Sequence, residues 1–585
     1  MNPFLIVPFL VFSLSIAFPS VRADELDGTG SVSGRVASTE PLVAGSVYLR
    51  EPKRNLTYMV YTADGRFSAP YVLPGNYEVT VEQPGLVSTS QQVSVSPGAE
   101  ITIDLEVERE GQGVRVVGSR PVAPVAFAGY EEIYPPGPGR DTLERTCIVC
   151  HGVNWISQRS GNDATAWTAF VDMMLNMNDS IWGIEDGTPM MPPGAINAAQ
   201  RKELIAYLAE HFGPDQPARM VRNDEDLPLD QAALGKAMWV EYTVAQPKSP
   251  DGQNRWIQEP YFDLQGNVWY TERTRGAPAI LKLDPRTGEF TRFPTPNPQW
   301  SPHGLVVDPQ NPQMLWWAGR GVEVTRMDMK TGEMTPYGDT SNPQRWGGHT
   351  PVFDSRGNLW WTQIAADRIG YWDRKTDELK HFDIPNKGGR PYGILVDHDD
   401  KVWFAEFYGC QVTRFDPETE SFTEYTLPSS PCTSRRLGLD SKGIIWYGAF
   451  SSGKLGRIDP KTGEMKEYRI GRFSEPYEAW ADPDDKIWLT DGGQGGMLVR
   501  FDPDTEQFTY YPSPRRSDMP KMAITGEGAV WYSNRSYASS GHGPATVGVL
   551  YPDVSRMTTL GAYYQVDEWG KAYGSGSPHP AKPTR

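Results

Sequence analysis

The segment Asn267-Val268-Trp269-Tyr270-Thr271-Glu272 decides the fold of the C-terminal part of the chain, because related segments follow it at a regular spacing. In each of them an apolar residue precedes a tryptophan, and an aromatic residue or a leucine follows it. The seven tryptophans are 42 to 47 residues apart and are Trp269, Trp316, Trp360, Trp403, Trp446, Trp488 and Trp531. An apolar residue followed by aspartate, as in Leu283-Asp284 and Ile458-Asp459, keeps the same period.

Each repeat has the turn residues and the apolar pattern of four short strands. One four-stranded sheet cannot bury both of its faces, whereas sheets stacked around an axis can. The repeat therefore predicts a seven-bladed β-propeller over residues 230–565. Two segments compete for the outer strand of the last blade: 240–244, which matches the pattern of 422–426, and 557–560.

The blades resemble those of the virginiamycin B lyase (streptogramin lyase) family over roughly residues 250–550. The resemblance rests on Pro302-His303-Gly304-Leu305, on Arg390-Pro391-Tyr392-Gly393-Ile394 and on the Trp-x-x-Glu strand ends. It implies a site at the central axis, where in that family a histidine base and a divalent metal ion held by carboxylate act on a cyclic depsipeptide.

Ten polar residues are expected to face the axis: Glu272, His303, His349, Gln363, Tyr392, Glu406, Arg435, Arg436, Tyr477 and Asp491. His303 and His349 occupy matching turns of consecutive blades. They are the candidate catalytic residues, with Glu272 and Glu406 as carboxylates around a Mg²⁺ ion. No Glu-x-His follows a blade tryptophan, although the lyase base would be expected there. A polar, solvated funnel whose histidines only form hydrogen bonds is therefore the alternative.

The second informative segment is Cys147-Ile148-Val149-Cys150-His151. Two thiols separated by two residues and followed by histidine have the spacing that attaches haem c: the thiols bond to the vinyl groups, and the imidazole binds the iron. The alternatives are a redox dithiol, which does not need the histidine, and half of a zinc site, which needs a second Cys/His pair. The motif predicts one covalent haem, held by Cys147 and Cys150, with His151 as the proximal iron ligand.

The residues around the motif, 136–216, resemble a class I c-type cytochrome and are expected to form a small all-α domain. Apolar residues at helical spacing predict one helix over 166–177 and a second over 197–213. The resemblance implies a methionine as distal iron ligand, and the segment between the haem motif and the second helix offers Met173, Met174, Met177, Met190 and Met191. Met191, in a loop beside two prolines, is preferred, and Met174 is the rival; a helical methionine otherwise packs in the core.

Residues 1–23 are apolar and end in Val21-Arg22-Ala23, which resembles a secretory signal peptide cleaved after Ala23. No basic residue precedes the apolar core, so a retained anchor is the alternative. Covalent attachment of haem outside the cytoplasmic membrane agrees with export, and the periplasm is the expected location.

Residues 28–108 alternate between apolar and polar side chains and predict a small antiparallel β-sandwich. The turns at Asp64-Gly65 and Leu73-Pro74-Gly75 resemble those of the carboxypeptidase regulatory-like domain, whose members are usually accessory or adhesive. Residues 109–135, rich in Gly, Pro, Val and Ala, are expected to be a linker. The two remaining cysteines, Cys410 and Cys432, are expected to form a disulfide in an oxidising compartment.

The composition favours a multidomain, mainly β protein, since 585 residues exceed one core and include 51 prolines, 58 glycines and 19 tryptophans. A net charge of −17 argues against nucleic acid as a partner. Apart from the signal peptide, no run of residues has the length and hydrophobicity of a membrane span.

Three functions are compatible with this organisation. The first is an exported cytochrome that transfers single electrons, with the propeller as the platform for a substrate or for a redox partner such as a periplasmic dehydrogenase or another cytochrome. The second is a lyase-like, metal-assisted enzyme at the propeller axis, and the third is a haem-containing binding or sensor protein. Electron transfer is the predicted function, because haem is the cofactor that the sequence implies most directly.

Overall fold

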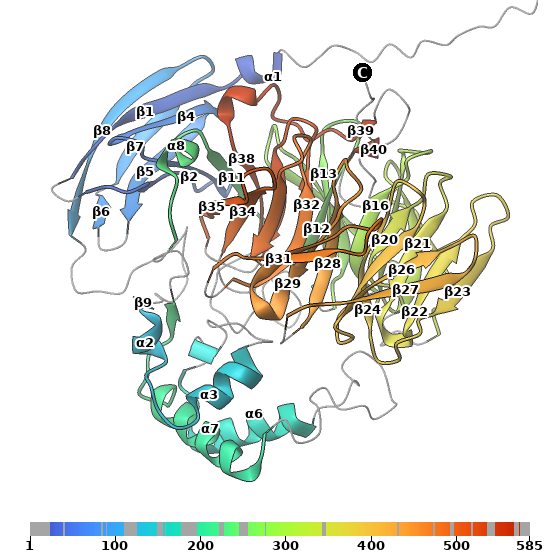
Figure 1. Cartoon of the computed structure of the whole chain (residues 1–585). Coiled ribbons are helices and arrows are strands. Elements are labelled where there is room, and N and C mark those ends of the chain that lie inside the picture. The colour runs from blue at the N-terminus through green and yellow to red at the C-terminus, as the bar shows by residue number, and fades with distance from the viewer. Residues whose placement is uncertain are drawn as a thin grey trace, which may run out of the picture.

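The computed structural model describes residues 24–38, 41–83, 86–88, 90–109, 126–148, 156–157, 160–176, 196–221, 227–244, 256–274, 276–341, 347–429, 432–471, 474–491, 496–515, 519–534, 545–566 and 572–573. Within these ranges the chain is mainly β and has six short α-helices (Figure 1). None of the described helices is long and apolar enough to cross a membrane. The predicted signal peptide, residues 1–23, lies outside the described ranges.

Six four-stranded antiparallel sheets form the first six blades of a propeller. The first blade contains β12 (Ile257–Phe262), β13 (Val268–Glu272), β14 (Ala279–Asp284) and β15 (Glu289–Pro294). The second contains β16 (Ser301–Val307), β17 (Met314–Arg320), β18 (Val322–Asp328) and β19 (Met334–Tyr337). The third contains β20 (Pro351–Phe353), β21 (Leu359–Gln363), β22 (Arg368–Trp372) and β23 (Leu379–Asp383).

The next three blades repeat the same order. The fourth contains β24 (Pro391–Val396), β25 (Val402–Glu406), β26 (Gln411–Asp416) and β27 (Ser421–Thr426). The fifth contains β28 (Ser434–Leu439), β29 (Ile445–Ala449), β30 (Lys454–Ile458) and β31 (Met465–Arg469). The sixth contains β32 (Pro476–Ala481), β33 (Ile487–Asp491), β34 (Met497–Asp502) and β35 (Gln507–Pro512). Short 3₁₀ turns occur at Ile364–Ala366, Phe450–Ser452 and Val554–Arg556.

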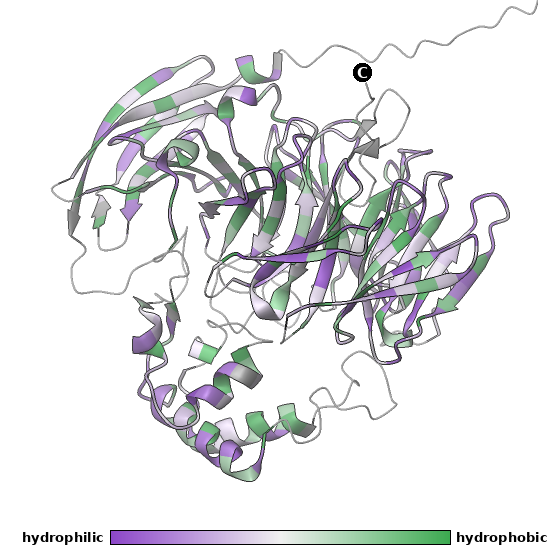
Figure 2. Cartoon of the chain, viewed as in Figure 1, coloured by the Kyte–Doolittle hydropathy of each residue, from purple (hydrophilic) through white to green (hydrophobic). Residues whose placement is uncertain are grey.

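A hydrogen bond between an aspartate and a tryptophan explains why the tryptophans recur. All seven repeated tryptophans lie in the core, with at most 2% of their surface exposed. In five blades the indole N–H donates to an aspartate six residues earlier, in the turn before the second strand: Asp263–Trp269, Asp354–Trp360, Asp397–Trp403, Asp440–Trp446 and Asp482–Trp488, at 2.7–3.2 Å. A buried indole N–H usually has such a partner. Figure 2 shows apolar residues concentrated along the strands and hydrophilic residues in the loops.

The seventh blade closes the ring with a strand from the start of the propeller region. It contains β36 (Met522–Ile524), β37 (Val530–Asn534), β38 (Thr546–Tyr551) and, as its outer strand, β11 (Met238–Thr243), which pairs antiparallel with β38. Of the two segments that could have completed this blade, 240–244 therefore contributes the strand, and 557–560 forms none. Closure by a strand distant in sequence fastens the two ends of the ring together.

The N-terminal strands continue the seventh blade. They are β1 (Gly30–Ser38), β2 (Ser46–Glu51), β3 (Leu56–Tyr61), β4 (Arg66–Val72), β5 (Gly75–Gln83), β6 (Leu86–Ser88), β7 (Gln91–Val95) and β8 (Glu100–Arg109). Strand β11 pairs with β38 on one side and with β3 on the other, so blade and sandwich form one twelve-stranded sheet. Apolar residues of both parts share one core, in which Leu49 and Tyr58 join Tyr242 and Trp269.

The expected small all-α domain is wrong as a description of the fold. The segment contains α2 (Tyr130–Ile133), α3 (Arg140–Leu143), a π-helix (Glu144–Ile148), α6 (Ala164–Asn176) and α7 (Ala198–His211). Helices occur where 166–177 and 197–213 predicted them, but two parallel strands, β9 (Ala126–Ala128) and β10 (Arg219–Val221), pair across the ends of the segment. Its remaining helices have single turns, so the segment is a small mixed unit in a chain that is mainly β.

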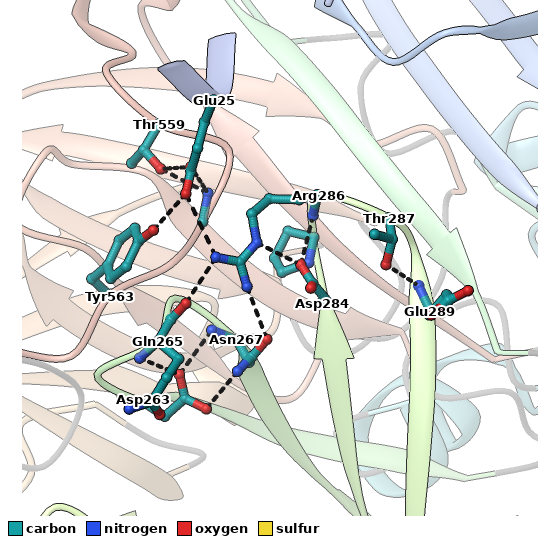
Figure 3. Close-up of polar contacts among 12 residues, drawn as sticks. Glu25, Asp263, Gln265, Asn267, Asp284, Arg286, Thr287, Glu289, Thr559 and Tyr563 are labelled. Carbon is teal, nitrogen blue, oxygen red and sulfur yellow. Dashed lines mark hydrogen bonds and ion pairs between the residues drawn. The ribbon is translucent and has the colours of Figure 1, made fainter. Parts of the chain in front are cut away.

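The short helix α1, at the start of the described residues, is bonded to the propeller (Figure 3). Glu25, in α1 (Asp24–Asp27), accepts hydrogen bonds from Thr559 and from the hydroxyl of Tyr563, 2.6 Å away, and lies 3.5 Å from Arg286. Burial alone would raise the pKa of Glu25, but these partners outweigh burial and the pKa lies below its usual value. The remaining short elements are α8 (Gln231–Leu234), β39 (Gln565–Val566) and β40 (Ala572–Tyr573).

Candidate site at the propeller axis

The first strand of each blade is the innermost, and its opening residues carry the site. Around the ring these first strands contact one another; β12, for example, contacts both β16 and β36. In five blades the strand register shifts at the start of this strand. A bulge of this kind redirects the side chains beside it. The residues within these shifts are Gln258, Glu259, His303, Tyr392, Gly393, Arg435, Arg436 and Tyr477.

Ten polar or ionisable side chains converge there, and we call them the axis cluster: Gln258, Glu259, His303, His349, Tyr392, Arg435, Arg436, Tyr477, Glu478 and Lys521. Each of the seven blades contributes at least one of them. Nine have at most 5% of their surface exposed, and Arg435 is half-buried. So many buried ionisable groups must be compensated by one another or by a ligand.

The two histidines of the cluster lie face to face. The ring centroids of His303 and His349 are 3.8 Å apart, and those of His349 and Tyr392 are 3.9 Å apart. Burial lowers the pKa of both histidines well below the usual value. The positive charges of Arg436, Lys521 and Arg273 lower it further. Both rings are therefore neutral at physiological pH.

Neighbouring groups determine which nitrogen of each ring carries the proton. Arg273 Nη1 donates to Gln258 Oε1 at 3.1 Å, which directs the Gln258 amide nitrogen toward His303 Nε2, also at 3.1 Å. His303 Nε2 therefore accepts, and the proton of the neutral ring is on Nδ1. His349 Nδ1 faces the carbonyl oxygen of Tyr392 at 3.3 Å, which can only accept, so His349 has its proton on Nδ1 and a lone pair on Nε2.

The charged members of the cluster are linked through Glu259. Lys521 forms an ion pair with Glu259, and Arg436 Nη2 lies 4.0 Å from the same carboxylate oxygen. Burial, together with the charge of Arg436, lowers the pKa of Lys521 to about 8. Burial raises the pKa of Glu478, whose Oε2 accepts the backbone N–H of Met522 at 2.7 Å. Arg436 Nη1 donates to Thr350 Oγ1 at 3.2 Å.

Aromatic rings surround the half-buried member of the cluster. The guanidinium carbon of Arg435 lies 3.7 Å from the ring centroid of Phe450, 4.6 Å from that of Tyr477 and 4.9 Å from that of Phe407. These rings, with Tyr392, belong to one small apolar cluster. We call Tyr392, Phe407, Phe450 and Tyr477 the aromatic collar. Stacking over several rings holds the guanidinium in place.

The structure brings some of the predicted site residues together and leaves others apart. His303 and His349 meet, as do Tyr392, Arg435, Arg436 and Tyr477. Glu272 instead binds Arg292 at 2.8 Å and Thr274, and Glu406 binds Asn386 and Thr413. Gln363 binds Arg368 and Gly347, and Asp491 accepts the N–H of Glu475. These four residues end second strands, one strand away from the axis.

The axis cluster does not fit the Mg²⁺ ion that the sequence suggested. Over the described ranges, no three His, Cys, Asp or Glu side chains converge as a metal site would require. The carboxylates expected as ligands, Glu272 and Glu406, have partners of their own. Lys521 and Arg436 occupy the neighbourhood of Glu259, the carboxylate that does reach the axis. Two cations beside it oppose the binding of a further cation.

Four members of the axis cluster were missed from the sequence: Gln258, Glu259, Glu478 and Lys521. A proline lies at or just before the start of the inner strand in several blades, and the residue after it belongs to the axis cluster: Pro302-His303, Pro391-Tyr392, Pro476-Tyr477 and Pro520-Lys521. This recurring proline would have identified Lys521. Gln258 and Glu259 precede Pro260 and break the pattern.

The predicted haem site lies only in part within the described residues. Cys147 is on the π-helix that follows α3, half-buried, and packs with Ile148 against an apolar cluster that includes Trp167 and Leu204. On α6, Met174 is half-buried, whereas 47% of the surface of Met173 is exposed. Cys150, His151, Met177, Met190 and Met191 lie outside the described residues. In the fourth blade and the loop after it, Cys410 and Cys432 form the expected disulfide.

The helical segment lies beyond the face of the propeller at which the inner strands begin. Glu25 and Tyr563 contact the opposite face, at the turns around Asp263 and Asp284. In Figure 1, α1 and β39 are at that face, whereas α3, α6 and α7 lie below the other face. Leu227, which follows the helical segment, packs against the apolar core of the sixth blade.

Two parts of the chain match models of known protein families. The model of the virginiamycin B lyase family matches residues 241–499 and 378–542, and the model of the carboxypeptidase regulatory-like domain matches residues 31–108. Neither of them covers the helical segment. No curated protein matches the chain.

Solved structures similar to the chain include a streptogramin B lyase and the virginiamycin B lyase of Staphylococcus aureus. The first is 24% identical, covers 54% of this chain and 97% of its own, and has a TM-score of 0.46. The second is 19% identical, covers 54% of this chain and 99% of its own, and has a TM-score of 0.46. Because the two family matches together span residues 241–542, more than half of the 585 residues, the chain belongs to the virginiamycin B lyase family.

Proposed function

We propose that the chain is an exported haem protein that transfers single electrons, and that the axis face of its propeller binds the substrate or the redox partner. The partner would be a periplasmic dehydrogenase or another cytochrome. The predicted signal peptide, cleaved after Ala23, would deliver the chain to the periplasm, where haem c is attached.

The motif Cys147-x-x-Cys150-His151 carries this proposal. Attachment of haem c requires two thiols separated by two residues and a histidine directly after them, and the motif has both features. The surroundings of Cys147 fit the group, because its side chain is half-buried beside an apolar cluster with half-buried members such as Ile148 and Phe170. An apolar setting of this kind suits a macrocycle and limits its contact with water.

Each residue of the proposed site has a defined task. Cys147 and Cys150 would hold the haem by thioether bonds, and His151 would be the proximal iron ligand. Met191 is the proposed distal ligand, with Met174 on α6 as the alternative. The haem would supply a one-electron couple, and histidine–methionine ligation raises its potential.

The position of the helical segment supports a joint role for haem and propeller. The helices lie beyond the propeller face at which the inner strands begin, and the axis cluster is formed by the opening residues of these strands. A substrate or partner bound at the axis face would therefore be on the haem side of the molecule. The aromatic collar and the buried ionisable groups of the axis cluster are the features there that could recognise it.

Replacing the motif cysteines is expected to abolish haem attachment. The chain is produced with its signal peptide in a bacterium that matures c-type cytochromes, and a denaturing gel is stained for haem. Cys147→Ala/Cys150→Ala should lose the haem band completely, because no thioether can form. The matched control is Cys410→Ala/Cys432→Ala, which removes the other two cysteines and should keep the band. An unstained wild-type chain, or equal staining of the Cys147→Ala/Cys150→Ala variant, would contradict the proposal.

A second candidate function, acid–base catalysis at the axis, is favoured by the neutral His303–His349 pair. His349 Nε2 has a lone pair that could accept a proton from a substrate. The test substrate is a cyclic depsipeptide, and the readout is its linearisation. If this function operates, His349→Ala should reduce the rate about 100-fold or more and leave haem staining unchanged. If the wild-type chain does not open the ring, the lyase-like function is rejected.

A further inference from the structure

The axis cluster and its immediate neighbours carry more positive than negative charge. Four cations are present: Arg273, Arg435, Arg436 and Lys521. Two carboxylates of the cluster oppose them, Glu259 and Glu478. Arg273, Arg436 and Lys521 each lower the pKa of both histidines. A buried site with this balance favours an anion.

Arg436 is the member whose donors are least satisfied. Only 2% of its surface is exposed, yet its Nε and Nη2 have no hydrogen-bond partner among the described residues. The Glu259 carboxylate oxygen that lies 4.0 Å from Nη2 is already paired with Lys521. Leaving buried guanidinium N–H groups unbonded costs free energy, which a bound acceptor would recover. Nε and Nη2 point the same way along one edge of the guanidinium and can donate to both oxygens of one carboxylate.

We propose that the axis cluster binds a small organic carboxylate, with Arg436 as its anchor and the aromatic collar around its apolar part. Arg435, the residue before the anchor on β28, is half-buried and lies over the rings of Phe450 and Tyr477. Phe407, which is half-buried, contributes apolar surface next to it. Aromatic side chains around an arginine suit a ligand that combines an anionic group with an apolar body.

This inference names the ligand class of the propeller platform in the proposed function, but binding itself does not require the haem. The Glu259 carboxylate does not argue against an anion, because Lys521 neutralises it. His303 is neutral and contributes no charge to the site, so the positive charge comes from the arginines and Lys521. The site thus differs in chemistry from a carboxylate-held metal centre.

Titration calorimetry with benzoate tests the proposal. The protein is the full chain with Cys147→Ala/Cys150→Ala, so that failure of haem attachment cannot affect the result. Benzoate is expected to bind, and benzyl alcohol, which has the same ring without the charge, is not. Arg436→Gln should weaken benzoate binding at least tenfold. Arg469→Gln, an exposed arginine on the outer strand of the same blade, should leave it unchanged.

Other results of the same titration would contradict the carboxylate site. Equal binding of benzoate to the Cys147→Ala/Cys150→Ala chain with and without Arg436→Gln, or no binding to the chain that keeps Arg436, would overturn the proposal. Inorganic phosphate that binds as tightly as benzoate and displaces it would identify a site for inorganic anions instead. If near-UV circular dichroism shows that Arg436→Gln does not fold, Lys521→Met takes its place. Loss of the second positive charge should weaken benzoate binding severalfold, and unchanged binding would again overturn the proposal.

Discussion

Replacing Trp239 with alanine is expected to lower the free energy of unfolding by about 3–5 kcal/mol and to weaken sandwich and propeller together. Trp239 is fully buried on β11, where it pairs with Met59 of the sandwich on one side and with Leu550 of the seventh blade on the other. Its indole N–H donates to the hydroxyl of Tyr61 at 2.9 Å, and that hydroxyl bonds to the carbonyl of Pro512. The side chain therefore joins three parts of the chain.

Urea denaturation followed by circular dichroism and by limited proteolysis measures this effect. Trp239→Phe retains a ring and should lose less stability than Trp239→Ala. Tyr61→Phe removes only the hydroxyl and should cost about 1 kcal/mol. If the sandwich of Trp239→Ala unfolds at an unchanged urea concentration while the propeller is destabilised, the two parts are independent and the shared sheet does not couple them.

Glu259→Gln is expected to destabilise the chain by about 3–5 kcal/mol, because it leaves Lys521 buried without its carboxylate. Lys521 has 1% of its surface exposed and pairs with Glu259, which also lies near Arg436. The double variant Glu259→Gln/Lys521→Met removes both charges and should recover most of the loss, since it leaves no unpaired buried charge. A double variant as unstable as Glu259→Gln alone would contradict this explanation.

The pH dependence of stability gives an independent check on Lys521. Burial and the charge of Arg436 lower its pKa to about 8 in the folded chain. In the unfolded chain a lysine has a pKa of about 10.4. Between these values the unfolded chain binds more protons, so the contribution of Lys521 to the free energy of unfolding increases as pH rises through this window. Denaturation measured across the window should show this increase in the wild type and a smaller one in Lys521→Met.

The propeller could be predicted because its signals are local. The aspartate and tryptophan of one turn are six residues apart and bond to each other, as Asp397 and Trp403 do at 2.7 Å. That contact forms within one hairpin, so it leaves a pattern in each repeat. The closing strand β11 could be proposed because it resembles an outer strand of another blade, but its second neighbour, β3, could not be foreseen. Nothing in residues 56–61 distinguishes a strand edge that pairs with another domain from one that faces solvent.

The all-α prediction failed for a related reason. The helices α6 and α7 have local signals, including the capping box of Asn197 and Gln200. The pairing of β9 with β10 joins three residues near 126 to three near 219, and such short strands leave no periodicity to detect. A resemblance based on the haem motif and two helices therefore suggested a more helical unit than the chain forms.

The candidate site was found in part. His303 and His349 could be placed at the axis because they occupy matching positions in consecutive blades: His303 lies near the start of β16, and His349 lies just before β20. Glu272 and Glu406 were placed there because they end strands with tryptophans, but those strands are second from the axis. Their carboxylates bind partners such as Arg292 and Asn386. Which strand of a blade is innermost depends on how blades stack, and the sequence of one repeat does not contain that information.

A redox titration of the purified full-length chain, followed by visible absorption, tests the proposed electron transfer most directly. We expect one haem for each chain, retained after denaturation, and a single transition with the slope of a one-electron couple. Visible spectra without haem bands, from a chain exported in a host that matures c-type cytochromes, would contradict it.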